Sequence, residues 1–526
     1  MRSFRTTVCS VLAVCVCVDT AIAATLSGTI IDNSTGRATS ARIYIHDAAG
    51  QFFHVKSVGG EAIPYARRSG EQSVEVHTTI SAHPFRASLP PGEYTITVEK
   101  GKEYFAESRQ FTINDRDDKA ISIRLKRWVN MAADGWFSGE THVHREVAEL
   151  PLLQLAEDIN VAFPLTAWVT DSEETPVTHN KNRSAVPAAK LVHVDKDHVF
   201  WPVNTEYEIF TVRGRMHTLG AVFILNHKEQ FSLPAPPVTP IATEARRQGG
   251  FLELDKHNWP WSMMLVPQME VDLFELANNH MWRTEFLFGD WYTEYAPKFM
   301  NIEMIDGHFT ERGWIEFGFQ NYYALLNCGF NLRPTAGTAS GVHPVPFGYG
   351  RVYVKIDGDF GYNKWVQGLL AGHSFVTTGP MLAAEVTRKD ERTAQVRGQL
   401  ISAADPTTLE IVVNGRVTAQ IPTTAARGDD GVFRIQFSKR VPLDTTSWIA
   451  VRAFTKREGE RTSFAHTGPV HVAAEGKPLM PTRNQRDYLV KRVQDELARH
   501  RGVLSREALN EFEQALQRFE AVEAAE

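Results

Sequence analysis

Two histidines separated by a single residue, His142 and His144, are the side chains in this sequence that most directly suggest chemistry. They end the segment Trp136-Phe137-Ser138-Gly139-Glu140-Thr141-His142-Val143-His144. In an extended strand, residues i and i+2 point to the same face, so both imidazoles can reach one ion. Neutral imidazole is a common ligand of zinc and other first-row metals. An isolated His-x-His pair is more often structural, so the hypothesis needs support from elsewhere in the chain.

Four further histidines stand where predicted strands run into loops. His217 precedes a hydrophobic run, His257 precedes a Trp-Pro turn, His280 follows two asparagines, and His343 lies in a glycine-rich loop. Each of them alone is more often structural than a metal ligand. Together they occupy the kind of positions that a metal site at the mouth of an α/β barrel requires.

The elements that must position these histidines lie in a central region, residues 133–373, rich in histidine, tryptophan and acidic residues. Short apolar runs alternate here with helical patterns. Residues 222–225 are typical of a buried strand, and residues 365–372 of a helix end stopped by glycine. Such alternation predicts an α/β barrel-like core.

Two regions of β alternation flank this centre, so the fold class is multidomain, α/β plus all-β. Residues 24–128 contain short runs such as 26–31 and 94–98 between Gly, Pro and Asn turns, which predicts a small β-sandwich. This stretch, above all Leu89-Pro90-Pro91-Gly92-Glu93-Tyr94, resembles the carboxypeptidase regulatory-like domain. The resemblance implies an accessory module without chemistry of its own.

The C-terminal part is predicted as a second β-sandwich, residues 374–478, followed by a helical tail, residues 483–526. The apolar run 409–413 leads into Asn414-Gly415, a strong hairpin signal. In the tail, apolar residues recur at three- and four-residue steps. We expect this stripe to pack against the body of the protein.

The first 23 residues have the pattern of a secretory signal peptide. An apolar run from Val8 to Val18 follows two arginines and precedes Ala21-Ile22-Ala23. We therefore expect a secreted or periplasmic protein. Lipoprotein anchoring is the less favoured alternative, because Val14 is bulky where a small residue is expected before Cys15.

Composition excludes several classes of function. The formal net charge of -6, with no dense basic stripe, argues against a nucleic-acid partner. No other apolar run is long enough to predict a transmembrane segment. The Gly-x-Ser-x-Gly elbow of serine hydrolases and the phosphate-binding loop of nucleotide enzymes are also missing from the sequence. A small-molecule or polymer-conjugate substrate is the partner that these observations leave.

Residues 138–144 resemble the opening motif of the polymerase and histidinol phosphatase (PHP) metallohydrolases, in particular the carbaryl-hydrolase-like CehA/McbA branch. Residues 322–329, 337–341 and 372–380 extend the resemblance. It implies a distorted (β/α)7 barrel holding one to three divalent ions, with Zn or Mn expected. It further implies hydrolysis of ester, phosphoester or carbamate bonds.

The resemblance also assigns roles to single residues. The implied metal ligands are His142, His144, Glu208 (or the nearby Glu206), His217 and His257. Two family motifs differ here. Thr-Asp-His is present as Thr170-Asp171-Ser172, and Gly-Ser-Asp-x-His is present as Gly337-Thr338-Ala339-Ser340-Gly341. His280 or His343 is expected to supply a missing ligand if the site is complete.

A bound divalent ion lowers the pKa of its water toward about 7 and polarises the scissile bond. Asp171 and Glu140 are the candidate catalytic carboxylates, since either can orient that water or a ligand imidazole. The alternative for both is a capping or surface carboxylate.

Three functions remain open at this point. A secreted metal-dependent hydrolase is the preferred one. The second is a degenerate barrel that binds a ligand or carbohydrate without turnover, and the changed motifs favour it. The third is a surface protein whose two β-modules bind carbohydrate. Metal content separates the first from the third, and turnover separates the first from the second.

Overall fold

The structure of the chain, a computed structural model, describes residues 24–525 except 71–72, 115–117, 179–187, 458, 460 and 475. The predicted signal peptide, residues 1–23, lies outside the described residues. Within the described part, none of the helices combines the length and the apolar character that crossing a membrane requires.

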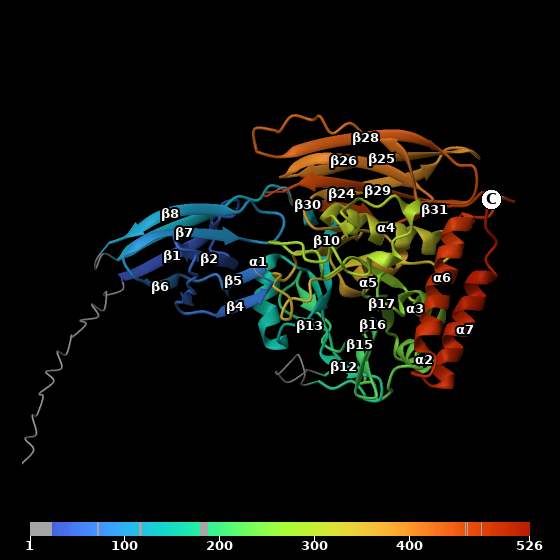
Figure 1. Cartoon of the computed structure of the whole chain (residues 1–526). Helices are drawn as coiled ribbons and strands as arrows, with labels where there is room; N and C mark the ends of the chain where they lie inside the picture. Colours follow the sequence, from blue (N-terminus) through green and yellow to red (C-terminus); the bar gives the residue numbers. More distant parts are fainter. Residues whose placement is uncertain are drawn as a thin grey trace, which may run out of the picture.

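The N-terminal region is a sandwich of two sheets, which Figure 1 shows in blue at one end of the molecule. The first sheet has the order β3 (Lys56–Ser57), β6 (Phe85–Leu89), β1 (Ala24–Asp32) and β9 (Lys119–Leu125). The second has the order β4 (Ala62–Ser69), β5 (Ser73–Ile80), β2 (Ala41–Asp47), β7 (Gly92–Glu99) and β8 (Glu107–Ile113). Alternating residues of β1 and β7 are buried between the sheets, as the period-two pattern predicts.

The central region contains two sheets. One has the order β12 (Ala167–Asp171), β15 (Thr205–Val212), β16 (Arg215–Leu225), β17 (Phe251–Leu254), β18 (Leu273–Ala277) and β21 (Arg333–Ala336). The other begins with β13 (Val192–His193), β14 (Val199–Phe200), β11 (Val161–Pro164), β10 (Trp136–Val143), β22 (Arg351–Lys355) and β23 (Ser374–Thr377).

Helices cover these sheets. Helices α2 (Thr239–Gln248) and α3 (Ser262–Met269) contact β17, α4 (Glu311–Asn327) contacts β18, and α5 (Tyr362–Ala371) contacts β22. Helix α1 (Leu150–Glu157) lies against strands β2 and β5 of the N-terminal sandwich. The shorter elements are η1 (Ala132–Asp134), η2 (Val147–Glu149), η3 (Thr293–Tyr295), η4 (Lys298–Met300), β19 (Met304–Ile305) and β20 (His308–Phe309).

The mixed α/β and strand-rich character is as predicted, but the described strands form no closed barrel, so the expected distorted (β/α)7 barrel is not confirmed. One reason is the connection between β15 and β16. Arg213 and Gly214 both have positive φ, 53° and 69°, so they make a two-residue hairpin where a barrel needs a crossover helix. A second reason is that β22 runs antiparallel to β10 and pairs with β23, so β21 pairs only with β18 and the two sheets do not join there.

The C-terminal region shares a sheet with the centre. After β23 the same sheet continues with β30 (Thr462–Thr467), β29 (Ser447–Lys456), β26 (Asp405–Val413) and β27 (Arg416–Gln420), while β31 (Val470–Val472) also pairs with β29. A layer of β24 (Met381–Arg388), β25 (Thr393–Ser402) and β28 (Phe433–Pro442) packs on this part. The predicted hairpin at Asn414-Gly415 is confirmed, with positive φ at both residues.

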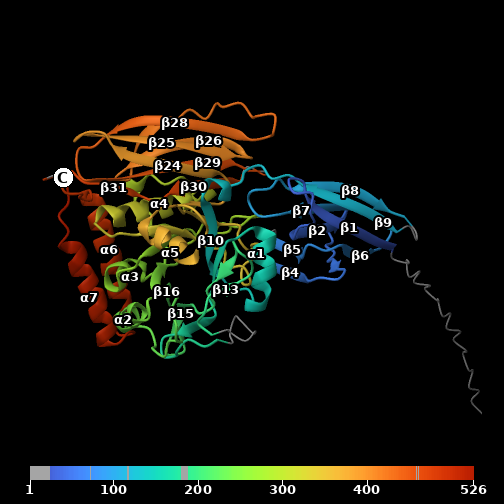
Figure 2. The ribbon, with the colours of Figure 1, turned by 180° about the vertical axis from the view of Figure 1, so that it is seen from behind.

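The helical tail packs back on the central body, as predicted. Helices α6 (Arg483–His500) and α7 (Arg506–Glu520) lie along the edge opposite the N-terminal sandwich, drawn in red in Figures 1 and 2. Phe512 and Phe519 of α7 are fully buried in the main hydrophobic core. The Glu511 carboxylate accepts hydrogen bonds from the backbone N–H groups of Val238 (2.8 Å) and Thr239 (2.8 Å), and so caps α2.

We expect Glu511→Ala to lower the free energy of unfolding by about 2 kcal/mol, because it leaves N–H groups at a helix N-terminus without partners. The matched control is Gln517→Ala, an exposed position of the same helix. Urea unfolding followed by circular dichroism measures the difference. Equal unfolding midpoints for the two variants would show that this contact does not hold the tail.

Candidate metal centre

His142 and His144 lie at the carboxyl end of β10 and point to the same side, as the spacing predicts. Their Nε2 atoms are 3.2 Å apart, and both side chains are buried. The ring of Phe223, from β16, packs on His142 with 4.4 Å between ring centroids. Two imidazoles are therefore held together away from bulk water.

Three carboxylates from neighbouring strands meet this pair. Glu206 of β15 places Oε2 3.3 Å from His144 Nε2. Glu275 of β18 places both carboxylate oxygens 3.2 Å from His142 Nδ1. Asp255, directly after β17, lies 3.7 Å from the same nitrogen. The five buried residues form two overlapping groups that could hold a metal ion, His142–His144–Glu206 and His142–Asp255–Glu275.

The spacing of the first group fits zinc. Ligand atoms about 2.0–2.1 Å from a tetrahedral zinc stand about 3.3 Å from one another. The His142–His144 separation of 3.2 Å and the His144–Glu206 separation of 3.3 Å match this value. Imidazole and carboxylate are also ligand types that zinc and manganese accept.

His142 belongs to both groups through different nitrogen atoms. A neutral imidazole has one lone pair, so when one nitrogen binds a metal the other carries the proton and donates it. Glu275 lies at Nδ1, where a carboxylate commonly fixes a metal-binding histidine. We infer that Nε2 of His142 faces the ion together with His144 and Glu206, and that Glu275 orients the ring.

Negative charge is concentrated around the two histidines. Glu253 of β17 is fully buried, and burial is the main cause that raises its pKa to about 8. Burial, followed by the neighbouring Asp255, raises the pKa of Glu275 well above its usual value. Lys256 is the one cation that contacts these described carboxylates, through an ion pair with Asp255. A divalent cation would supply the charge that this region lacks.

The glycine-rich loop after β21 lies directly against the histidines. The backbone N–H of Ala339 donates to the carbonyl oxygen of His142 (2.8 Å), and that of His144 donates to the oxygen of Ser340 (2.8 Å). A Cβ at Gly337 would stand 2.1 Å from Cβ of His142, so only glycine permits this approach. The family that this sequence resembles has Asp and His ligands at these positions. Here the loop contacts the histidine segment through backbone hydrogen bonds instead.

Glu140 holds this loop in place. Its carboxylate accepts hydrogen bonds from the backbone N–H groups of Thr338 (3.0 Å) and Gly348 (2.5 Å), and from the Thr338 hydroxyl. Burial raises the pKa of Glu140 to about 8 despite these bonds. Glu140, the predicted catalytic carboxylate, therefore fixes the loop that packs against His142.

The N-terminal sandwich contacts the same loop. The Tyr65 hydroxyl of β4 donates to the carbonyl oxygen of His343 (2.5 Å) and accepts from the N–H of Gly341 (3.0 Å). Arg67 donates to the carbonyl oxygen of Gly341 (3.0 Å). The module predicted to be an accessory therefore helps to fix the wall of the candidate site.

Three predicted histidine ligands lie near this centre but outside the two groups. The ring of His280 stacks on the ring of Phe288 with 3.6 Å between their centroids. The ring centroid of His343 lies 6.2 Å from that of His280. Burial, and then positive charge at Lys256, His343, His257 and His142, depresses the pKa of His280. Both ring nitrogens of His257 and Nδ1 of His280 are buried with no hydrogen-bond partner among the described residues. The rings themselves pack on aromatic side chains, His257 on Trp314 and Phe317 and His280 on Phe288.

The other predicted site residues lie elsewhere. His217 bonds to His500 of the tail (Nε2–Nδ1, 2.8 Å). Asp171 is partly buried, and its carboxylate accepts a hydrogen bond from the Thr211 hydroxyl (2.6 Å), the main cause of its lowered pKa. Glu208 accepts from the Trp168 indole N–H (3.1 Å). None of these three belongs to either group.

Asp255 and Glu275 were missed by the sequence analysis. Both interrupt or directly follow short apolar strands, Phe251-Leu252-Glu253-Leu254-Asp255 and Leu273-Phe274-Glu275-Leu276-Ala277. Acidic residues in fully buried strands are the available signal, because a lone buried carboxylate is costly without a partner. Glu206, rather than Glu208, takes the carboxylate position next to His144.

No protein-family model matches the chain, and no curated protein matches it. A crystal structure of a two-domain protein from Bacteroides vulgatus ATCC 8482, containing a predicted PHP-like metal-dependent phosphoesterase, is 10% identical with a TM-score of 0.30. The alignment covers 64% of this chain and 96% of that chain. A likeness of this size carries no conclusion about fold or function.

We expect Gly337→Ala to lower the free energy of unfolding by about 1–3 kcal/mol, because the added methyl group overlaps His142 and Glu275. The control is Gly92→Ala, where the nearest atom to the added Cβ is 3.6 Å away. Thermal unfolding of both variants gives the measurement. A Gly337→Ala protein as stable as the control would contradict the close approach of this loop.

Proposed function

We propose that this chain is a metal-dependent hydrolase with its centre at His142, His144 and Glu206. The observation that carries the proposal is the buried convergence of two imidazoles and three carboxylates from β10, β15, β17 and β18. The resemblance of residues 138–144 to a metallohydrolase motif supports the same reading. We further propose, from the pattern of residues 1–23, that the protein is secreted or periplasmic.

A divalent ion held there supplies Lewis acidity to a water molecule and to the oxygen of the scissile bond. The chain's own residues have distinct tasks. His142, His144 and Glu206 would bind the ion, and Glu275 would accept a hydrogen bond from Nδ1–H of His142, which keeps the proton on Nδ1 and leaves Nε2 free for the ion. Glu140 has an indirect role, because its carboxylate holds the loop that packs on His142.

Lys256 gives the site a fixed positive charge near the carboxylates. It is almost fully buried, pairs with Asp255 and lies 5.2 Å from the ring centroid of Trp259. An ammonium group in such a dry setting stabilises negative charge more strongly than one in water. This arrangement favours substrates that develop negative charge on oxygen, which are the esters, phosphoesters and carbamates expected from the motif.

The second candidate is a centre that binds a ligand without turnover. It is favoured by the glycine-rich loop, whose Thr338, Ala339 and Ser340 contact the histidine segment without adding a residue to either metal-binding group. Turnover is the property that separates the two candidates.

The first test compares the metal content of the purified protein with that of a His142→Ala/His144→Ala variant. Both are purified without chelators and supplied with zinc and manganese. We expect about one or more ions per chain in the wild type and a loss of roughly tenfold or more in the variant. His217→Ala is the matched control, because His217 bonds to the tail, and it should keep its metal.

Turnover is then measured on aryl phosphomonoesters, phosphodiesters, carboxylic esters and carbamates. Hydrolysis that depends on both metal and the histidine pair supports the hydrolase. Metal binding without hydrolysis of any class favours the non-catalytic candidate. A wild-type protein that binds no metal overturns the hydrolase and leaves the non-catalytic ligand-binding candidate.

The role of Glu275 is tested with Glu275→Gln. We expect metal affinity to fall about 10- to 100-fold, because the neutral amide fixes His142 less well than a carboxylate does. Glu208→Gln, on the same strand as Glu206 but bonded to Trp168, is the control and should bind metal as the wild type does. Competition with a fluorescent chelator measures both affinities, and equal values would remove Glu275 from the site.

A further inference from the structure

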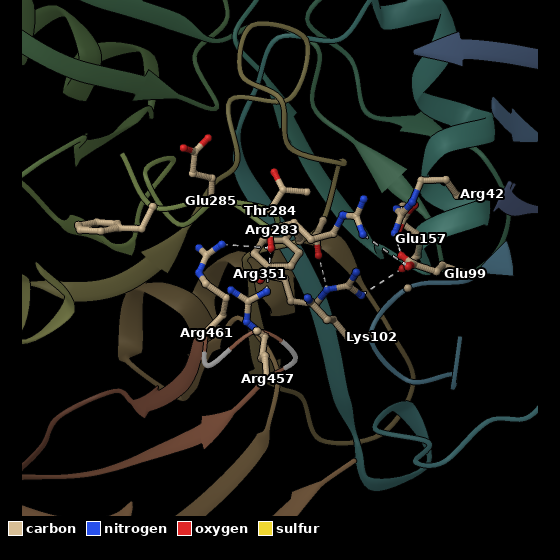
Figure 3. Close-up of a pocket in the computed structure, with 15 residues that line it drawn as sticks. Arg42, Glu99, Lys102, Glu157, Arg283, Thr284, Glu285, Arg351, Arg457 and Arg461 are labelled. Atoms are coloured by element: carbon tan, nitrogen blue, oxygen red, sulfur yellow. Dashed lines mark hydrogen bonds and ion pairs between the residues drawn. The ribbon is translucent and has the colours of Figure 1, made fainter. Parts of the chain in front are cut away.

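A cavity of about 720 Å³ lies where the N-terminal sandwich, the central body and the β29–β30 connection meet. Six basic side chains line it, and Figure 3 shows them as sticks: Arg42, Lys102, Arg283, Arg351, Arg457 and Arg461. They come from all three parts of the molecule. Such a volume is typical of a small-molecule site.

Most of the basic groups at this cavity have a carboxylate partner: Arg283 pairs with Glu75, and Arg457 and Arg461 both pair with Glu311. Glu99 and Glu157 both form ion pairs with Arg42. Glu285, the third lining carboxylate, accepts a hydrogen bond from Ser73. Lys102 has no carboxylate partner among the described residues, and its Nζ instead lies 3.7 Å above the ring centroid of Tyr349. Lys102 and Arg351 are thus the basic groups of this cavity that form no ion pair within the described part of the chain.

Two of the guanidinium groups also have unused donors. Arg351 is fully buried and donates Nε to the carbonyl oxygen of Gly348 (2.8 Å) and Nη1 to that of Glu157 (3.1 Å). Its Nη2, and Nε of Arg457, are buried without a hydrogen-bond partner in the described part of the chain. A buried charged donor without a partner is costly, so these atoms indicate an anionic occupant.

Lys102 lies close to both arginines. Burial, and then the positive charges of Arg351 and Arg457, depresses the pKa of Lys102 well below its usual value. Figure 3 shows Lys102, Arg351 and Arg457 in the middle of the view, with Arg42, Glu99 and Glu157 grouped to one side. Three cationic side chains thus share one region of the cavity, and an anion there would relieve their mutual repulsion.

We propose that this cavity binds a phosphate or sulfate group through Lys102, Arg351 and Arg457, either as a free ion or as part of an organic ligand. Guanidinium groups bind such oxyanions with paired, charge-assisted hydrogen bonds. The volume leaves room for an organic body attached to the anion. This site is separate from the metal centre, and the inference does not depend on the proposed function.

The cavity and the metal centre share one loop. The N–H of Gly348 donates to Glu140, and the oxygen of Gly348 accepts from Arg351. Glu140 in turn bonds to Thr338, whose N–H donates to the carbonyl oxygen of His142 (3.2 Å). An anion at Arg351 is thus connected to the histidine pair through a short series of hydrogen bonds.

The test is isothermal titration of the protein with inorganic phosphate, inorganic sulfate, glucose 6-phosphate and glucose, at constant ionic strength. We expect saturable binding of the anions and none of glucose. Tighter binding of the sugar phosphate than of the free ion identifies an organic ligand, and equal binding identifies the free ion. The His142→Ala/His144→Ala protein should bind the anions equally well, which excludes binding at the metal centre.

The variant for this test is Lys102→Gln/Arg457→Gln, with Arg434→Gln as the control, because Arg434 forms an exposed ion pair with Asp430 on the C-terminal layer. We expect at least a roughly tenfold loss of anion affinity in the first and none in the second. Should the double variant fail to fold, acetylation of Lys102 in the wild type, followed by mass spectrometry, takes its place, and phosphate should slow it. No saturable binding, equal losses in both variants, or no protection of Lys102 would overturn the proposal.

Discussion

Buried negative charge around His142 is the constraint on which the rest of the central region depends. Glu206, Glu253, Asp255 and Glu275 are held in a space that is almost closed to water. Burial, and then repulsion from the neighbouring Asp255, raises the pKa values of Glu253 and Glu275. Either protons or a cation must compensate. The paired imidazoles, with ligand atoms spaced as around a zinc ion, favour a cation.

The loop after β21 connects this constraint to the other domains. Gly337 lets it lie against His142, and Glu140 bonds to its Thr338 and Gly348 amides. Tyr65 of the N-terminal sandwich bonds to the same loop from outside. A module whose sequence suggests only an accessory role thereby stabilises the wall of the candidate site. The three regions of the chain form one structural unit around it.

Local patterns predicted the individual elements well. The hairpin at Asn414-Gly415, the strand at 222–225, the helix end at Gly372 and the packing of the tail are confirmed. Each depends on turn residues or apolar periodicity within a few residues. The distorted (β/α)7 barrel is not confirmed, because forming a barrel depends on how distant strands pair. The two-residue Arg213-Gly214 turn forces an antiparallel pair that the general alternation of strands and helices did not indicate.

The sequence by itself determined that His142 and His144 face the same side, because the period of two in a strand is a local property. Only the tertiary structure decided which carboxylates join them. Glu206, Asp255 and Glu275 are separated from the pair by 62 or more residues and come from three different strands. It also placed His217 at the tail and gathered Lys102, Arg351 and Arg457 in one cavity. These contacts between residues far apart in the sequence depend on the pairing of distant strands and on the packing of domains. The spacing of residues along the sequence carries no signal for either.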